Sequence, residues 1–142
     1  MKNGYQKGMI AGAISGVIMG ILVTPIYIIS ILIGVSEILV SEAVWDLSMY
    51  MLTISAHVSL GFIWGIIFGL LYSKYYESTP GKGIMKGLYF GLIIWTVKDI
   101  AAGSYTAFIL QEGQTAKFLI YYGFFMWIIY GLILGMLYKK SD

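Results

Sequence analysis

Four long apolar stretches occupy most of this 142-residue chain, and they constrain its fold more than any other feature. They cover residues 8–34, 47–72, 83–110 and 118–138. Each exceeds the roughly 20 residues that an α-helix needs to cross a hydrocarbon core about 30 Å thick. The apolar runs are continuous rather than alternating, which favours helices over a membrane β-barrel. The sequence therefore predicts an all-α polytopic membrane protein, a bundle of four transmembrane helices.

The composition leaves room for little else. Hydrophobic residues make up 59% of the chain and charged residues 11%, whereas soluble domains have about 45–50% apolar and about 25% charged residues. We expect one transmembrane domain over residues 1–142, with helices at about 7–34, 47–74, 80–110 and 115–139. The chain has no cysteine, catalytic triad pattern or phosphate-binding loop, so we expect no enzyme activity, catalytic residue, metal or cofactor.

The lysines are distributed unevenly between the two sides that four spans would create. One side holds the two termini and the loop between the second and third helices, with Lys2, Lys7, Lys74, Lys82, Lys86, Lys139 and Lys140. The other side holds Glu37, Glu42, Asp46 and Glu112, with Lys117 as its only lysine. Cytoplasmic loops carry an excess of lysine and arginine. The pattern predicts a multi-pass protein of the cell membrane with both termini in the cytoplasm.

An internal repeat becomes visible when the glycines are aligned. The first and third helices both begin K-G-x-x-x-G-x-x-x-G, at Lys7 and at Lys82. The second and fourth helices both end G-x-x-x-G-x-x-Y-x-K, from Gly65 and from Gly131. This pattern predicts two tandem helical hairpins, residues 1–76 and 77–142, with parallel topology. The alternative is that glycine ridges recur in membrane helices without duplication.

These glycines predict close helix packing. Helices in a bilayer associate through small residues spaced four apart, because lipid offers no hydrophobic driving force between them. The packing residues expected are Gly12, Gly16, Gly61, Gly65, Gly69, Gly87, Gly91, Gly131 and Gly135. We expect enough glycine surface to form a homo-oligomer or to dock onto another membrane subunit. The expected partners are therefore the lipid bilayer and membrane proteins, and not nucleic acid.

Lys98 and Asp99 are adjacent within the third apolar stretch. Each such charge costs roughly 2.5–3.5 kcal/mol at a helix centre, so an intramembrane pair indicates function or assembly. At about 100° per residue, Lys98 shares the face of Gly87 and Gly91, whereas Asp99 lies about 100° away. The two need not be each other's partner, and at least one should point toward another helix.

A polar site at similar depth is possible around this pair. His57 lies on the glycine and aromatic face of the second helix, and Thr24 precedes Pro25, which can kink the first helix and free a carbonyl. Tyr105 would lie nearer the outer surface. The candidate intramembrane site is therefore His57, Lys98, Asp99, Thr24 and Tyr105.

Two interpretations of this site remain open. In the first, the charges fix helix packing or bind a partner, and the chain is an integral membrane subunit or assembly component without catalytic activity of its own. In the second, Asp99 titrates, Lys98 balances its charge and His57 accepts a proton, in a small homo-oligomeric transporter or channel.

The run of glycines that follows His57 carries a family resemblance. Gly61, Gly65 and Gly69 lead to Tyr72, and Lys82-Gly83 then begins the glycine ridge of the third helix. This arrangement resembles small four-helix membrane proteins of the YagU-like kind. The resemblance implies a fold and no established activity.

Overall fold

The structure is a computed structural model that describes residues 2–32 and 47–138. Its elements in chain order are α1 (Lys2–Leu32), α2 (Leu47–Tyr75), α3 (Ile84–Trp95), η1 (Thr96–Ile100), α4 (Ala101–Phe108) and α5 (Gly113–Leu137). Helices and their short connections account for all of the described ranges, which contain no strand. The predicted all-α class is confirmed.

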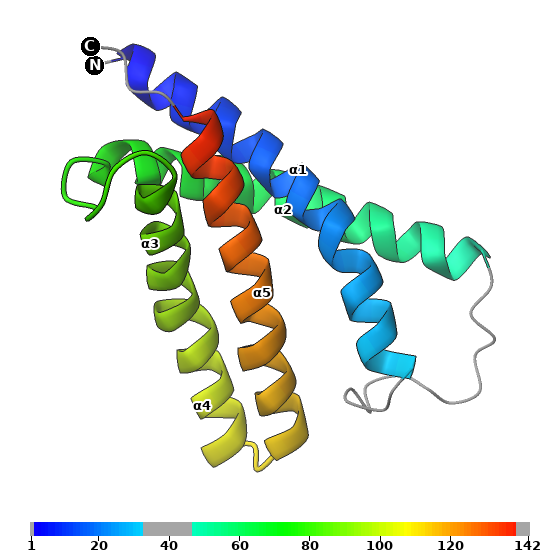
Figure 1. The fold of residues 1–142 in the computed structure, drawn as a ribbon. Helices are drawn as coiled ribbons and strands as arrows, with labels where there is room; N and C mark the ends of the chain where they lie inside the picture. The colour runs from blue at the N-terminus through cyan, green and yellow to red at the C-terminus, as the bar shows by residue number, and fades with distance from the viewer. Residues whose placement is uncertain (1, 33–46, 139–142) are drawn as a thin grey trace.

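The third helical segment is continuous but irregular. The π-helical turn η1 joins α3 to α4, and Thr96 and Ala101 at its two junctions keep right-handed helical backbone angles. Figure 1 shows α3 and α4 as one rod that lies antiparallel to α5. The chain therefore forms two helical hairpins, α1 with α2, and α3–η1–α4 with α5.

Within the described residues, three helices are long and apolar enough to cross a membrane: Gly4–Ile29, Tyr50–Tyr75 and Gly113–Leu137. The predicted fourth span at about 80–110 is not among them. Its helix is divided by η1, so that α3 has 12 residues and α4 has 8. Three apolar spans in an all-helical chain indicate a membrane protein.

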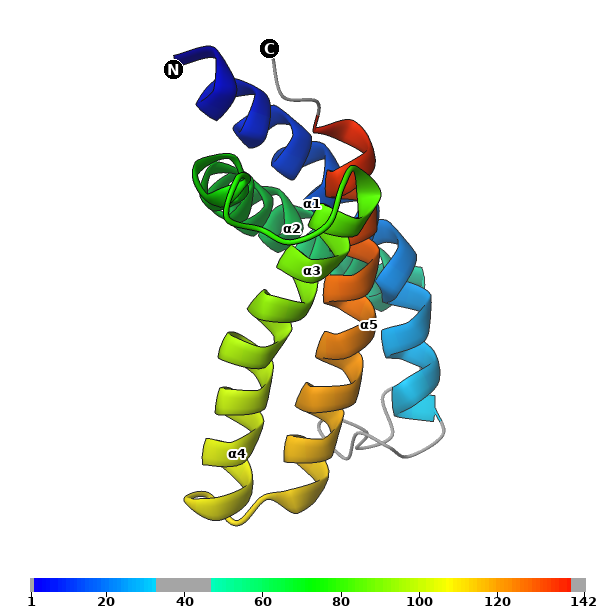
Figure 2. The ribbon, with the colours of Figure 1, turned by 60° about the vertical axis from the view of Figure 1, so that its left-hand side comes forward.

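The two hairpins cross instead of running alongside each other. In Figure 1, α5 stands upright, α2 crosses it nearly sideways, and α1 follows a direction between the two; Figure 2 shows the same crossing from another side. The start of α1, the end of α5 and the α2–α3 connection lie at one end of this assembly. The α4–α5 turn lies at the other end.

The third helical segment begins later than the predicted position near residue 80. Gly81 and Gly83 have positive φ values of 89° and 52°, so the chain turns there before α3 starts at Ile84. Lys86 anchors this turn, because its Nζ donates a hydrogen bond of 2.5 Å to the carbonyl of Tyr76. Glycine reaches such backbone angles at little steric cost, which explains the delayed start.

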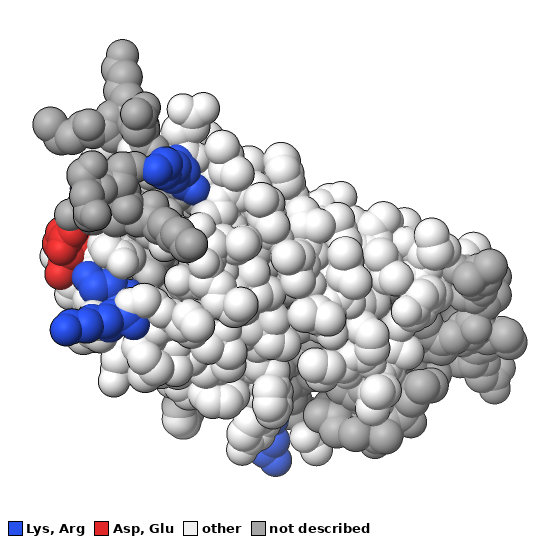
Figure 3. All heavy atoms as spheres, turned by 45° about the horizontal axis from the view of Figure 1, so that its top comes forward, with Lys and Arg blue, Asp and Glu red and all other residues white. Residues whose placement is uncertain are grey.

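The core lies where the two hairpins meet. The largest fully buried side chains are Tyr72, Tyr130, Leu134 and Val23, which come from α2, α5 and α1. Tyr130 links the hairpins directly, because its hydroxyl donates to the Gly65 carbonyl at 3.2 Å. In Figure 3, most of the lysine side chains in view gather at one end of the molecule, one lies at the lower edge, and the middle of that face shows no charged side chain. An uncharged middle face is what contact with lipid requires.

Candidate functional site

The first hairpin is closed by a ladder of glycines. A Cβ atom added to Gly12 would overlap the backbone of Gly65 and Gly69, and one added to Gly16 would overlap the carbonyl of Gly61. At the next step, a Cβ on Gly20 would reach the backbone of His57. The helices can approach this closely only because these positions lack side chains.

The second hairpin has the same ladder, with one carboxylate side chain in it. Gly87 faces the backbone of Gly131 and Gly135, as the aligned glycines of the first hairpin face each other. At the next step, Gly91 faces the backbone carbonyl of Trp127, and one turn farther along α5 Gly123 packs against the side chain of Asp99. The predicted packing role of these glycines therefore describes contacts within the chain.

Asp99 occupies the space that Gly123 leaves open. It lies in η1 and is 3% exposed, and a Cβ atom on Gly123 would overlap its carboxylate. One carboxylate oxygen accepts a hydrogen bond from the indole N–H of Trp127. The other accepts from Lys98 Nζ at 2.6 Å. Both oxygens are thus occupied, so the carboxylate ties η1 to α5.

Lys98 and Asp99 form an ion pair with each other, although they are sequence neighbours on a helix. The π turn contributes to this geometry, because more residues share one turn and successive side chains lie closer in direction than in an α-helix. The lysine side chain is 45% exposed and the aspartate side chain 5%. Lys98 Nζ also lies 5.6 Å from the ring centre of Trp127. As expected, one member of the pair, Asp99, points toward another helix.

His57 belongs to a separate contact between the hairpins. Its Nδ1 is 3.0 Å from the Thr53 carbonyl, and its Nε2 is 3.1 Å from the Tyr122 hydroxyl. A carbonyl only accepts, so in a neutral ring Nδ1 carries the proton and Nε2 accepts from Tyr122. Tyr27 packs edge-on against the His57 ring at 5.1 Å.

Thr24 and Tyr105 do not join this site. Thr24 is fully buried, and its hydroxyl donates to the Gly20 carbonyl of its own helix at 2.7 Å. Tyr105 is 57% exposed on α4. The predicted cluster of five residues is therefore divided into the Lys98–Asp99 pair, the His57–Tyr122 pair and two residues that contact neither. The sequence analysis missed Trp127, although its position in the glycine ladder was a visible signal.

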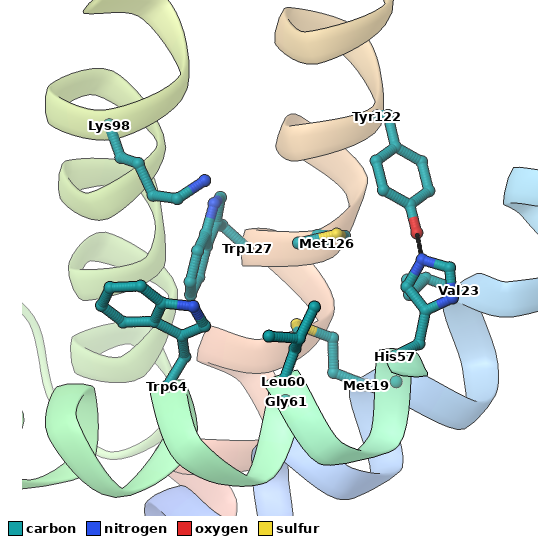
Figure 4. Close-up of a pocket in the computed structure, with 11 residues that line it drawn as sticks. Met19, Val23, His57, Leu60, Gly61, Trp64, Lys98, Tyr122, Met126 and Trp127 are labelled. Atoms are coloured by element: carbon teal, nitrogen blue, oxygen red, sulfur yellow. Dashed lines mark hydrogen bonds between the residues drawn. The ribbon is translucent and has the colours of Figure 1, made fainter. Parts of the chain in front are cut away.

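A cavity of about 240 Å³ lies between the two pairs, where α1, α2, η1 and α5 meet. In Figure 4, Lys98 and the hydrogen-bonded His57 and Tyr122 stand on opposite sides of it, with Trp127 and Met126 between them. The lining is mainly apolar, and its members are Met19, Gly20, Val23, His57, Leu60, Gly61, Trp64, Lys98, Tyr122, Met126 and Trp127. His57 and Lys98, which belong to different pairs, thus line the same cavity.

Comparison with known proteins adds a family to this geometry. A family described as a family of unknown function, DUF6789, matches residues 3–142, which is nearly the whole chain. The chain belongs to this family. No curated protein and no solved structure matches it. The YagU-like resemblance is not confirmed, and the family assigns no activity to the site.

Proposed function

We propose that the chain is a four-span protein of the cell membrane that acts as a non-catalytic subunit or assembly component. The fourth span would be α3, η1 and α4 together, because their 12, 5 and 8 residues make a continuous helix as long as the 25-residue α5. The charges in its middle are opposite and in contact at 2.6 Å. Pairing lowers the cost of placing them inside a bilayer.

The crossing of the hairpins is compatible with four spans. A membrane normal along α1 would tilt α2 and α5 to opposite sides, and membrane helices tilt by up to about 40°. In that orientation both termini and the α2–α3 connection share one side, with Lys7, Lys74, Lys82 and Lys86 near it. The positive-inside rule supports a cytoplasmic location for that side.

The observation that carries the assembly role is the uncovered state of α2. In the most apolar 18-residue stretch of α2, only 17% is buried, compared with 44% in the corresponding stretch of α1 and 39% in that of α5. Its exposed residues include Ser55, Ala56 and Ser59, which are small residues spaced as in a helix-packing ridge. The ladder glycines, in contrast, are already in contact within the chain. We therefore place the partner-binding surface on the outer face of α2, defined by Ser55, Ala56 and Ser59.

Cysteine cross-linking in native membranes tests this surface, because the chain has no cysteine of its own. Ser59→Cys should give a cross-linked dimer, or a cross-link to a second membrane protein, on mild oxidation or with a short bifunctional reagent. Ala102→Cys is the matched control, since Ala102 is a small exposed residue on α4. Equal cross-linking at both positions, or none at Ser59→Cys, would contradict the proposal.

The cavity favours a second candidate, a small homo-oligomeric transporter or channel. His57 and Lys98 line the same space, and both are ionisable side chains inside the four proposed spans. Proton and ion flux in liposomes tests this candidate, with His57→Gln and Asp99→Asn measured beside the unchanged chain. Flux that falls in both variants while the protein stays folded would favour transport over assembly.

A further inference from the structure

The cavity presents hydrogen-bond donors without matching acceptors. The Lys98 ammonium has three N–H donors, and within the described part of the chain its one hydrogen-bond partner is Asp99. Trp64 also lines the cavity, is 43% exposed, and has no hydrogen bond from its indole N–H within the described residues. Both groups can only donate. Inside a bilayer an unpaired donor is costly, so an oxygen acceptor is expected in this space.

The nearby charges favour a neutral acceptor over an anion. Asp99 already balances the charge of Lys98 at 2.6 Å. At the far side of the cavity, the Tyr122 hydroxyl is hydrogen-bonded to His57 at 3.1 Å. Lys98 and Trp64 can only donate, and Asp99 cancels the charge of Lys98. A carbonyl oxygen suits these two donors, because it accepts without donating and carries no charge.

The shape and lining of the space favour a flat ring with an apolar tail. Trp64, Trp127 and Tyr122 give the cavity aromatic walls. A groove of about 250 Å³ lies beside it between α2 and α3, with Lys98 common to both. Apart from Lys98, its lining residues are apolar or aromatic: Phe68, Leu71, Tyr75, Phe90, Ile93, Ile94 and Val97. Small-molecule sites commonly have volumes of about 300–1,000 Å³, which neither space reaches alone, so a ligand that occupies both would place its head group in the cavity and its tail in the groove.

We propose that this cavity binds a membrane-soluble quinone, whose two ring carbonyls accept hydrogen bonds from Lys98 and Trp64 and whose tail lies in the groove beside α3. This inference concerns ligand binding and rests on the cavity, whereas the assembly proposal rests on the outer face of α2. Either one can fail without the other, since cross-linking at Ser59 does not depend on the cavity.

Native mass spectrometry of the detergent-solubilised protein tests the proposal, with decylubiquinone as the probe. One quinone per chain should bind saturably. Decylbenzene has a ring and a tail but no carbonyl, and palmitate has a tail and a carboxylate. We expect both to bind at least about tenfold more weakly than the quinone, which corresponds to ~1.4 kcal/mol. Equal binding of decylbenzene, preferred binding of palmitate, or no saturable adduct would each overturn the proposal.

Variants locate the bound quinone. The double variant Lys98→Met/Asp99→Asn removes the ammonium donor together with the carboxylate that balances its charge. It should weaken quinone binding about tenfold. Leu60→Trp fills the cavity from α2 and leaves the ion pair intact, so it tests the site even if the double variant fails to fold. Ile63→Trp is its matched control, because Ile63 is 54% exposed on α2 and lines neither space. Unchanged affinity in folded Leu60→Trp would place the quinone elsewhere and overturn the proposal.

Discussion

The seams of the two hairpins share one backbone pattern and differ in what fills it. In the first, Gly12 and Gly16 meet glycines of α2 at backbone distance. In the second, Gly91 faces the backbone carbonyl of Trp127, and Gly123 faces the side chain of Asp99. The carboxylate stands opposite a glycine, so both seams keep close contact. The comparison teaches that a glycine ladder can hold a buried charge where one helix supplies a glycine, here Gly123 of α5, and the facing helix supplies the carboxylate, here Asp99 of η1.

Counting onward from the aligned glycines makes the difference more specific. In steps of four, Thr24 aligns with Asp99, and His57 aligns with Gly123. Both aligned helices are also perturbed there, α1 by Pro25 and the third segment by η1. The first hairpin uses a hydroxyl that bonds its own helix at 2.7 Å, whereas the second uses a carboxylate that bonds α5. Duplication stays a prediction, which this shared order supports.

The largest effect is expected from filling the first seam. Gly16→Leu places a side chain against the Gly61 carbonyl, which belongs to the backbone and has no rotamer to adopt. Overpacking costs about 1–3 kcal/mol where neighbouring side chains can shift, and more where they cannot, so with backbone as the neighbour we expect loss of the folded monodisperse protein in detergent. Gly113→Leu is the control, since a Cβ there meets nothing within 4 Å. Equal yields of the two variants would show that the seam is not close-packed.

The next largest effect should come from removing the lysine of the second seam. Lys98→Met leaves the 5% exposed Asp99 side chain without its cation. Breaking a fully buried pair costs about 3–5 kcal/mol, and we expect a smaller loss here because the Lys98 side chain is 45% exposed. Asp99→Asn should cost less, because the ammonium left behind is 45% exposed. Thermal unfolding in detergent measures both, with Lys117→Met as an exposed lysine control. A larger loss for Asp99→Asn would show that the aspartate is hydrated rather than buried.

A smaller effect is expected from the indole that distinguishes the second seam. Trp127→Phe removes the donor to Asp99, and hydrogen bonds to charged groups contribute about 1.5–3 kcal/mol. Trp95→Phe removes a donor to the neutral Ile120 carbonyl at 2.9 Å, so its cost should be nearer ~1 kcal/mol. Chemical unfolding of both variants gives the difference directly. A cost for Trp127→Phe no greater than that for Trp95→Phe would mean that the carboxylate gains nothing from the indole.

Many residues of the site could be predicted from the sequence, but the side chains that they contact could not. The spacing of Gly12, Gly65 and Gly87 predicted which helix faces are closely packed, because period and residue size are local properties. The π turn was not predictable, since it depends on how α5 receives Asp99. Tyr105 was predicted on the helix face of Gly87, nearer the outer surface than the rest of the site, whereas its 57% exposure follows from the direction in which α4 faces.

The sequence by itself determined that this chain is helical and suited to a membrane, because apolar run length and composition are sums over residues. It also determined that a charged pair lies inside an apolar segment. Only the tertiary structure decided that the pair is closed by Trp127, that His57 bonds Tyr122 instead, and that the hairpins cross around a cavity. Those outcomes depend on the angle and register at which helices meet, which are set jointly by side chains far apart in the chain.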